Sequence, residues 1–252
     1  MKKFFVFLIV VALLGGLAYV AYKTINNEPI IPSTPGDDKP HIIVDEPTDA
    51  AAKVRVESVV VRNKTDNIDI NNVYPTITSF TNKEFENSIN KQIASTISDY
   101  RAEISSMVDD LTPEIKLYKY VTSYTKNTWG NYLTLVIEQD YQTGGIRSNT
   151  WKDIYNIDVE KERIIYLSDL FEPTTDYQTE IVHEIMRQAT ENNYKIMGGE
   201  GITRLPTNQK FYIQDGKLII YFDPSEVAAT SYGALEFEMP FVLNSSGYFQ
   251  IR

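Results

Sequence analysis

The feature that most constrains this chain is an uninterrupted apolar run of 19 residues, residues 4–22, which follows Lys2 and Lys3. As an α-helix this run would be about 28 Å long, which matches the hydrocarbon core of a bilayer. We therefore predict a single-pass transmembrane signal-anchor at residues 4–22, with residues 1–3 as a cytoplasmic stub because positive charge stays inside. A cleaved secretory signal is the alternative, although its apolar region is usually shorter. Both interpretations place the rest of the chain outside the cytoplasm, at the cell envelope.

Residues 23–52 form a predicted linker. They contain five of the 11 prolines, several aspartates and glutamates, and no aromatic residue. Such a segment cannot bury enough apolar surface to offset the entropy cost of ordering, so it stays extended. We expect it to hold the folded body away from the lipid.

The chain is acidic. It has 24 Lys and Arg against 34 Asp and Glu, and without Lys2, Lys3 and Lys23 the remaining 21 cations leave a net charge of −13. This balance argues against nucleic-acid binding, which needs basic side chains that neutralise phosphates. An acidic surface attracts cationic partners; solubility of an exported domain is the alternative explanation.

The sequence from residue 53 onward predicts an α+β body. Thr81 and Glu84 form a capping-box pair at a helix start. After them, apolar residues recur every three or four positions, which describes one buried stripe of a long helix. The stripe consists of Phe85, Ile89, Ile93, Ile97, Tyr100, Ile104, Met107 and Leu111.

Period-two patterns surround this helix and predict strands. Leu133, Leu135 and Ile137 alternate with polar residues after a turn at residues 128–131. Further strands are expected at residues 54–61, 151–159 and 164–167, and residues 215–216 predict a two-residue hairpin turn. A second helix follows Pro173, with Thr175 and Gln178 as its capping pair. We predict mainly antiparallel sheet with two packed helices.

Composition excludes several kinds of catalytic and metal site. The chain has no cysteine and only two histidines, His41 and His183. The zinc-protease helix motif needs histidine at its first and fifth positions, and the fifth position after His183 is Arg187. We expect no catalytic residue, no metal and no cofactor. The carboxylate pair of a glycan hydrolase stays open, because only separation in space identifies it.

Three groups of motifs carry a resemblance to a known family. Asn72-Val73-Tyr74-Pro75 with Ser88-Ile89-Asn90-Lys91 resembles the domain ahead of the catalytic region in PdaC-type peptidoglycan deacetylases. The other motifs resemble the extracytoplasmic domain of RsiV-type anti-sigma factors; they are Gly144-Gly145-Ile146-Arg147, Tyr155-Asn156-Ile157-Asp158, residues 167–171, Phe211-Tyr212-Ile213, Tyr221-Phe222-Asp223-Pro224, Glu226-Val227-Ala228 and residues 232–237. The resemblance divides the body into a PdaC-like subdomain at residues 53–113 and an RsiV-like subdomain at residues 114–252.

This resemblance implies an exported module that recognises something at the cell wall. RsiV-like members act as receptors for lysozyme, a cationic wall-degrading enzyme. The sequence departs from the family at Ile146 and Arg147, where Ala-His is usual, and at Ser225 and Ala229, where Tyr and Pro are usual. Only residues 1–3 precede the apolar run, so we expect no counterpart of the cytoplasmic anti-sigma region.

The leading hypothesis is a membrane-anchored, non-catalytic module that binds a lysozyme-like wall-acting protein or peptidoglycan. A carboxylate-based glycan hydrolase and a structural envelope protein that self-associates through some of its 17 tyrosines are the alternatives. Two loops with the family motifs are the predicted contact sites; tight turns that order the sheet are the other explanation for them. The predicted ligand-binding residues are Gly144, Gly145, Arg147, Pro224, Glu226, Tyr232 and Gly233.

Overall fold

A computed structural model describes residues 49–107, 117–143, 148–198, 201–244 and 248–250, all within one compact unit, Val44–Arg252. The predicted anchor at residues 4–22 lies outside the described residues, as does most of the predicted linker. No helix within the described ranges is long and apolar enough to cross a bilayer.

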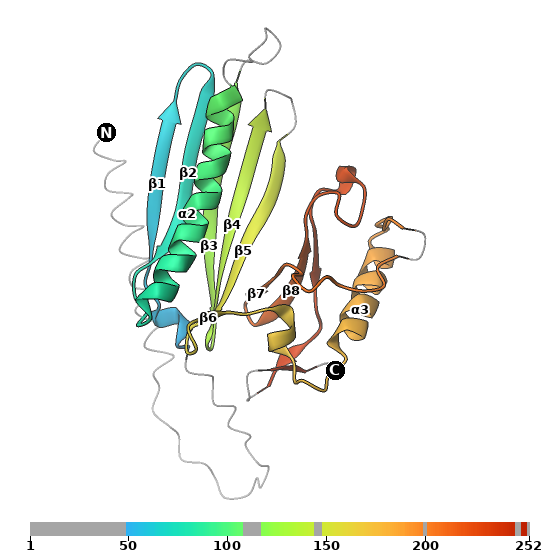
Figure 1. The fold of residues 1–252 in the computed structure, drawn as a ribbon. Helices are drawn as coiled ribbons and strands as arrows, with labels where there is room; N and C mark the ends of the chain where they lie inside the picture. Colours follow the sequence, from blue (N-terminus) through green and yellow to red (C-terminus); the bar gives the residue numbers. More distant parts are fainter. Residues whose placement is uncertain (1–48, 108–116, 144–147, 199–200, 245–247, 251–252) are drawn as a thin grey trace, which may run out of the picture. The chain divides into compact units, whose positions relative to one another are not determined.

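Six strands form the larger sheet, in the order β1-β2-β3-β4-β5-β6 (Figure 1). The strands alternate in direction except for β2 and β3, which are parallel. Their bounds are Val56–Lys64 (β1), Ile68–Ile77 (β2), Tyr118–Trp129 (β3), Tyr132–Thr143 (β4), Asn149–Asp158 (β5) and Arg163–Ile164 (β6).

The parallel pair exists because the long helix α2, Lys83–Ser106, connects β2 to β3. A parallel connection needs a crossover of a dozen or more residues, and a helix supplies it. Figure 1 shows α2 running along β2 and β3. The predicted apolar stripe of this helix is confirmed, because Ile89, Ile93, Ile97 and Ile104 are buried in one core cluster with Leu133 and Leu135 of β4. Leu111 lies outside the described residues.

Both predicted helix starts are wrong by one residue. Asn82 is the N-cap of α2, and its side chain accepts a hydrogen bond from the Phe85 amide. Asp176 caps helix α3, Tyr177–Glu191, and accepts from the Thr179 amide. A short side-chain oxygen at the N-cap satisfies one of the free amides of the first turn, and Asn82 and Asp176 do this in place of Thr81 and Thr175.

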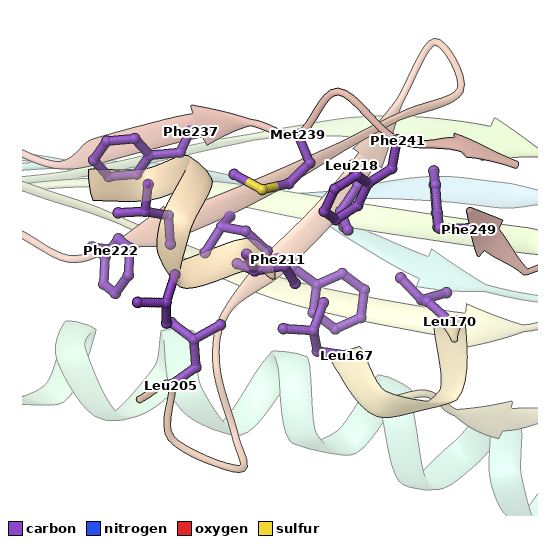
Figure 2. Close-up of a cluster of buried hydrophobic side chains, with 14 of the residues drawn as sticks. Leu167, Leu170, Leu205, Phe211, Leu218, Phe222, Phe237, Met239, Phe241 and Phe249 are labelled. Carbon is purple, nitrogen blue, oxygen red and sulfur yellow. The ribbon is translucent and has the colours of Figure 1, made fainter. Parts of the chain in front are cut away.

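A second core forms around the smaller sheet, which consists of β7 (Phe211–Gln214), β8 (Lys217–Phe222) and β9 (Leu235–Glu238). Helix α3 contributes Ile181 and Ile185, and the 3₁₀ helix η3, Leu167–Leu170, contributes its two leucines. Figure 2 shows the leucines of η3 gathered with phenylalanines from β7, β8 and β9 and with Met239. Strand β10 (Val242–Leu243) pairs with β11 (Phe249–Gln250), and Phe249 also belongs to this core.

Both predicted hairpins are confirmed. Gly130 and Asn131 join β3 to β4, and Asp215 and Gly216 join β7 to β8. Asp215 has φ 51° and Gly216 has φ 74°, the left-handed values that a two-residue turn between twisted strands requires. The prediction of an α+β fold with mainly antiparallel sheet and two helices therefore holds for the described residues.

The first described residues attach to the tip of the β3–β4 hairpin. The Ala51 amide, in the 3₁₀ helix η1 (Ala51–Lys53), donates to the Gly130 carbonyl at 3.0 Å. The Lys126 Nζ donates to the Val54 carbonyl at 2.8 Å, and the Thr128 hydroxyl donates to Asp49 at 3.1 Å. The chain is thus fastened to β3 and β4 before it enters β1.

Candidate ligand-binding site

An open pocket of about 310 Å³ lies where β8 and the start of β9 meet the large sheet. The side chains that pack toward α2 on β4 are Leu133, Leu135 and Ile137. Because successive side chains of a strand point to opposite faces, Glu138 and Asp140 point away from α2. The lining consists of Val121, Ser123, Glu138, Gln139, Asp140, Thr150, Trp151, Lys152, Tyr221 and Ala234.

Strand register places the pocket residues in two rows across β3, β4 and β5. Ser123, Glu138 and Lys152 lie directly opposite one another in the first row. The second row consists of Val121, Asp140 and Thr150. Directly opposed residues in antiparallel strands have side chains on one face within contact distance, so the two rows form one floor that is polar except at Val121.

Lys152 is the central cation of the site. Its ammonium group pairs with Glu236 of β9 and lies 3.8 Å from Glu138. The Lys152 Nζ also lies 5.2 Å from the ring centroid of Tyr212 and 5.7 Å from that of Tyr221, which is within the range of cation–π attraction. The side chain is 21% exposed. Lys152 therefore joins the large sheet to the small one at the edge of the pocket.

Asp140 contributes a carboxylate to the pocket. Its Oδ2 atom lies 3.3 Å from the Lys119 ammonium, and its Oδ1 atom is buried without a hydrogen-bond partner. Among the described residues, the carboxylates of Glu138, Asp140 and Glu236 lie close to only two ammonium groups, those of Lys119 and Lys152. The group keeps an excess negative charge, which suits a basic ligand.

Two buried tyrosines fix the geometry between the sheets. The Lys152 amide donates to the Tyr221 hydroxyl at 3.0 Å, and the Tyr212 hydroxyl donates to Glu236 at 2.9 Å. Burial, followed by the charge of Asp223, raises the pKa of Tyr221 well above its usual value; burial and then Glu236 do the same for the pKa of Tyr212. Both phenols therefore keep their protons at neutral pH.

A second polar pocket of about 300 Å³ lies beside β6 and η3. Its two cations are already paired: Lys161 with Asp158 at 3.1 Å, and Arg163 with Asp169 at 3.0 Å. The pairs leave little net charge to attract a ligand. We therefore place the candidate site at the first pocket.

The predicted contact residues separate into two groups. Gly144, Gly145 and Arg147 lie outside the described residues, but the strands on either side of them lead into the pocket through Asp140 and Thr150. The loop at residues 224–233 is described, and the residue that follows it, Ala234, lines the same pocket. Described residues that are close in sequence to both predicted loops thus line one pocket.

Inside the described loop, the predicted contact residues also bind their own chain. Pro224 begins a turn in which the Glu226 carboxylate accepts a hydrogen bond from the Asp223 amide at 2.8 Å. The Tyr232 ring lies 5.5 Å from that of Tyr194 in an edge-on contact. Gly233 has φ 72° and ψ −152°, a conformation that is essentially restricted to glycine.

Sequence reasoning missed the floor of the pocket, above all Glu138, Asp140 and Lys152. A signal was present, because Glu138 and Asp140 follow on the positions of β4 that alternate with Leu133, Leu135 and Ile137. What the sequence could not provide was the strand register that aligns them with Ser123 and Thr150.

The described residues contain no group of three or more His, Asp or Glu side chains arranged to hold a metal ion. In the pocket, Glu138 and Glu236 approach the same ammonium group instead of facing each other across an open space. Glycoside hydrolysis needs one carboxyl group that carries a proton and a second that is ionised. In this structure the Lys152 ammonium group lies between the two carboxylates.

Residues 168–242 match the model of a family described as a protein of unknown function, DUF3298. Two proteins of Bacillus subtilis (strain 168) are distant homologues. Anti-sigma-V factor RsiV is 26% identical over 192 residues, which is 72% of this chain and 66% of RsiV. Peptidoglycan-N-acetylmuramic acid deacetylase PdaC is 21% identical over 240 residues, which is 92% of this chain and 47% of PdaC. The matches therefore span less than two thirds of either relative.

The crystal structure of a DUF3298 family member from Bacteroides fragilis has the same fold. It superimposes with a TM-score of 0.54 at 15% sequence identity and covers 75% of this chain and 90% of that one. The expected resemblance to RsiV and PdaC is confirmed at the level of distant homology.

Proposed function

We propose that the chain is a non-catalytic, membrane-anchored binding module of the cell envelope, and that its acidic pocket binds a basic wall-acting protein of the lysozyme type. The observation that supports the proposal is the acidic pocket, whose lining includes residues that are close in sequence to both predicted contact loops. Asp140 and Thr150 flank one loop, and Ala234 follows the other.

Charge supports a basic partner. The pocket carboxylates outnumber the lysines that face them, and the whole chain has a net charge of −10. Opposite charge on the two partners speeds their encounter and fixes the orientation of binding. The distant homology to RsiV agrees with a role in binding, and the resemblance described above names lysozyme as the kind of partner.

A titration tests this proposal directly. The full chain, purified in detergent micelles, is immobilised and exposed to increasing concentrations of a cationic lysozyme. We expect saturable binding that weakens as salt shortens the electrostatic screening length from about 10 Å at 0.1 M to about 3 Å at 1 M. Absence of saturable binding at low salt would show that the partner class is wrong.

A pair of variants assigns the binding to the pocket. The double substitution Glu138→Gln and Asp140→Asn removes two negative charges from the pocket floor and should lower the affinity about three- to tenfold. The matched control, Glu84→Gln with Asp99→Asn, removes the same charge from exposed positions of α2, on the opposite face of the sheet. Equal losses in the two variants would indicate general charge attraction and no specific role for the pocket.

Peptidoglycan is the second candidate ligand, and the hydroxyl groups of Ser123 and Thr150 beside Tyr221 favour it. Uncharged sugar rings bind through hydroxyl contacts and aromatic faces. Soluble wall fragments are therefore titrated in the same assay, and their binding should change little with salt. Release of soluble sugars from peptidoglycan by the purified chain would instead identify a hydrolase.

The proposed location follows from the apolar run at residues 4–22. A reporter enzyme that is active only outside the cytoplasm, fused after Arg252, should be active. Membrane fractionation of the same fusion separates an uncleaved anchor from a cleaved signal. A reporter that is active only in the cytoplasm would contradict the proposed topology.

A further inference from the structure

Among the described residues, strand β1 has a free edge. It pairs with β2 along all nine of its residues, and within the described ranges no strand lies on its other side. Figure 1 shows β1 at the margin of the large sheet. An exposed strand edge presents a row of unpaired amide and carbonyl groups and therefore serves as a template for another strand.

Two backbone hydrogen bonds identify which residues face the free edge. The Thr78 amide donates to the Arg55 carbonyl, and the Thr65 amide donates to the Ile68 carbonyl. Opposed residues of an antiparallel pair alternate between hydrogen-bonded and non-hydrogen-bonded positions. Odd-numbered residues of β1 therefore bond to β2, and the even-numbered residues direct their amides and carbonyls outward.

The middle of β1 lacks the features that usually protect an edge. Val59, Val60 and Val61 are consecutive, and the Val60 side chain is 49% exposed. Natural edge strands commonly carry a proline, a bulge or a central lysine that prevents pairing. The register of β1 with β2 is continuous, so it contains no bulge, and its cations, Arg62 and Lys64, lie near one end.

We propose that β1 pairs with β1 of a second copy of this chain, in antiparallel orientation about a twofold axis at Val60. Val60 is the central residue of the strand, Val56–Lys64, and it is one of the outward-bonding residues. A twofold axis at this position pairs all nine residues of one copy with all nine of the other. The two large sheets then become one continuous sheet.

The sequence of β1 suits this register with itself. Val60 meets Val60, and Val59 meets Val61 of the other copy. Each charged side chain faces an uncharged one: Glu57 faces Asn63, Arg62 faces Ser58, and Lys64 faces Val56. Like charges directly opposite each other destabilise a strand pair, and this register has none. The self-complementarity favours a second copy over an unrelated extended peptide.

Cysteine cross-linking tests the register, because the chain has no cysteine of its own. In Val60→Cys, the two new thiols lie in a hydrogen-bonded pair with Cα atoms about 5.5 Å apart, within the range that a disulfide spans. We expect a covalent dimer when the full chain in detergent is mildly oxidised. The matched control is Arg62→Cys on the same edge. Its two thiols would be four strand positions apart, about 13 Å, and should not cross-link.

Mixed chains and a charge substitution complete the test. Ser58→Cys chains mixed with Arg62→Cys chains should form the heterodimer, because these residues face each other. Val60→Lys places two ammonium groups at the axis and should raise the dissociation constant of the dimer about tenfold or more. A full chain that stays monomeric at high concentration, or Arg62→Cys that cross-links as efficiently as Val60→Cys, would overturn the proposal. Dimerisation needs no ligand, so this outcome is independent of the binding assay.

Discussion

Replacement of Lys152 by Met provides a direct test of how the two sheets are joined. Methionine keeps the long unbranched stem and removes the ammonium group. The substitution breaks the pair with Glu236 and the cation–π contacts with Tyr212 and Tyr221, while the backbone bond from the Lys152 amide to Tyr221 remains.

The loss of unfolding free energy that we expect for Lys152→Met lies between two limits. An exposed ion pair contributes about 0.2 to 1 kcal/mol, and removal of one partner of a buried pair costs about 3 to 5 kcal/mol. The Lys152 side chain is 21% exposed and that of Glu236 is 38% exposed, so the pair lies between these limits. With the weakened cation–π contacts, we expect a loss of about 2 kcal/mol in the free energy of unfolding.

Urea denaturation of the full chain measures this loss, and a thermal scan should show a Tm lower by about 4 to 8 °C. The matched control is Lys217→Met. Lys217 of β8 pairs at 2.8 Å with Glu238, which lies on β9 like Glu236, but both side chains of this pair are more than half exposed. The Lys217→Met variant should lose less than about 0.5 kcal/mol in the free energy of unfolding. If both variants lose equally little unfolding free energy, Lys152 does not hold the two sheets together.

Four further predictions concern the cores and turns. Ile93→Ala, at a fully buried position, should cost about 2 to 5 kcal/mol of unfolding free energy in urea titrations, and a loss below 1 kcal/mol would contradict the packing of α2 on the sheet. Gly233→Ala should cost about 1 to 3 kcal/mol through backbone strain alone, since an added Cβ meets no atom within 4 Å; Gly216→Ala should also change tryptophan fluorescence, because its Cβ would come within 2.8 Å of Trp129. Burial raises the pKa of Tyr155 to about 12, so its phenol should stabilise the fold fully below pH 10 and lose that contribution as the pH rises toward 12. Tyr155→Phe should flatten the alkaline limb of a stability–pH curve, and an unchanged limb would refute this.

Local patterns were sufficient for the elements whose packing is periodic. The spacing of Ile89, Ile93 and Ile97 required a one-sided helix, and Asp215-Gly216 allowed few structures other than a tight hairpin turn. In these segments, the residues that determine the structure are neighbours in the sequence. The register within the hairpins follows from the same local turns.

Contacts between residues far apart in the sequence determine the helix start, the parallel strand pair and the pocket, which local patterns did not predict. The Thr81 and Asn82 amides both donate to the carboxylate of Glu162, about 80 residues away, and this contact moves the helix start beyond Thr81. The parallel pairing of β2 with β3 depends on where α2 returns the chain. The pocket depends on the meeting of β4, β5 and β8, so no single segment contains the information for it.

The attachment of Asp49 and Ala51 to the β3–β4 hairpin has a mechanical consequence. Tension applied from the N-terminal side of the chain reaches Gly130 and Thr128 through their hydrogen bonds with these two residues. The load is therefore distributed over two of the longest strands of the sheet before it can peel β1 away from β2. A pulling experiment with handles at Asp49 and the C-terminus should show high resistance to rupture, followed by rapid unravelling of β1 once the hairpin contact breaks.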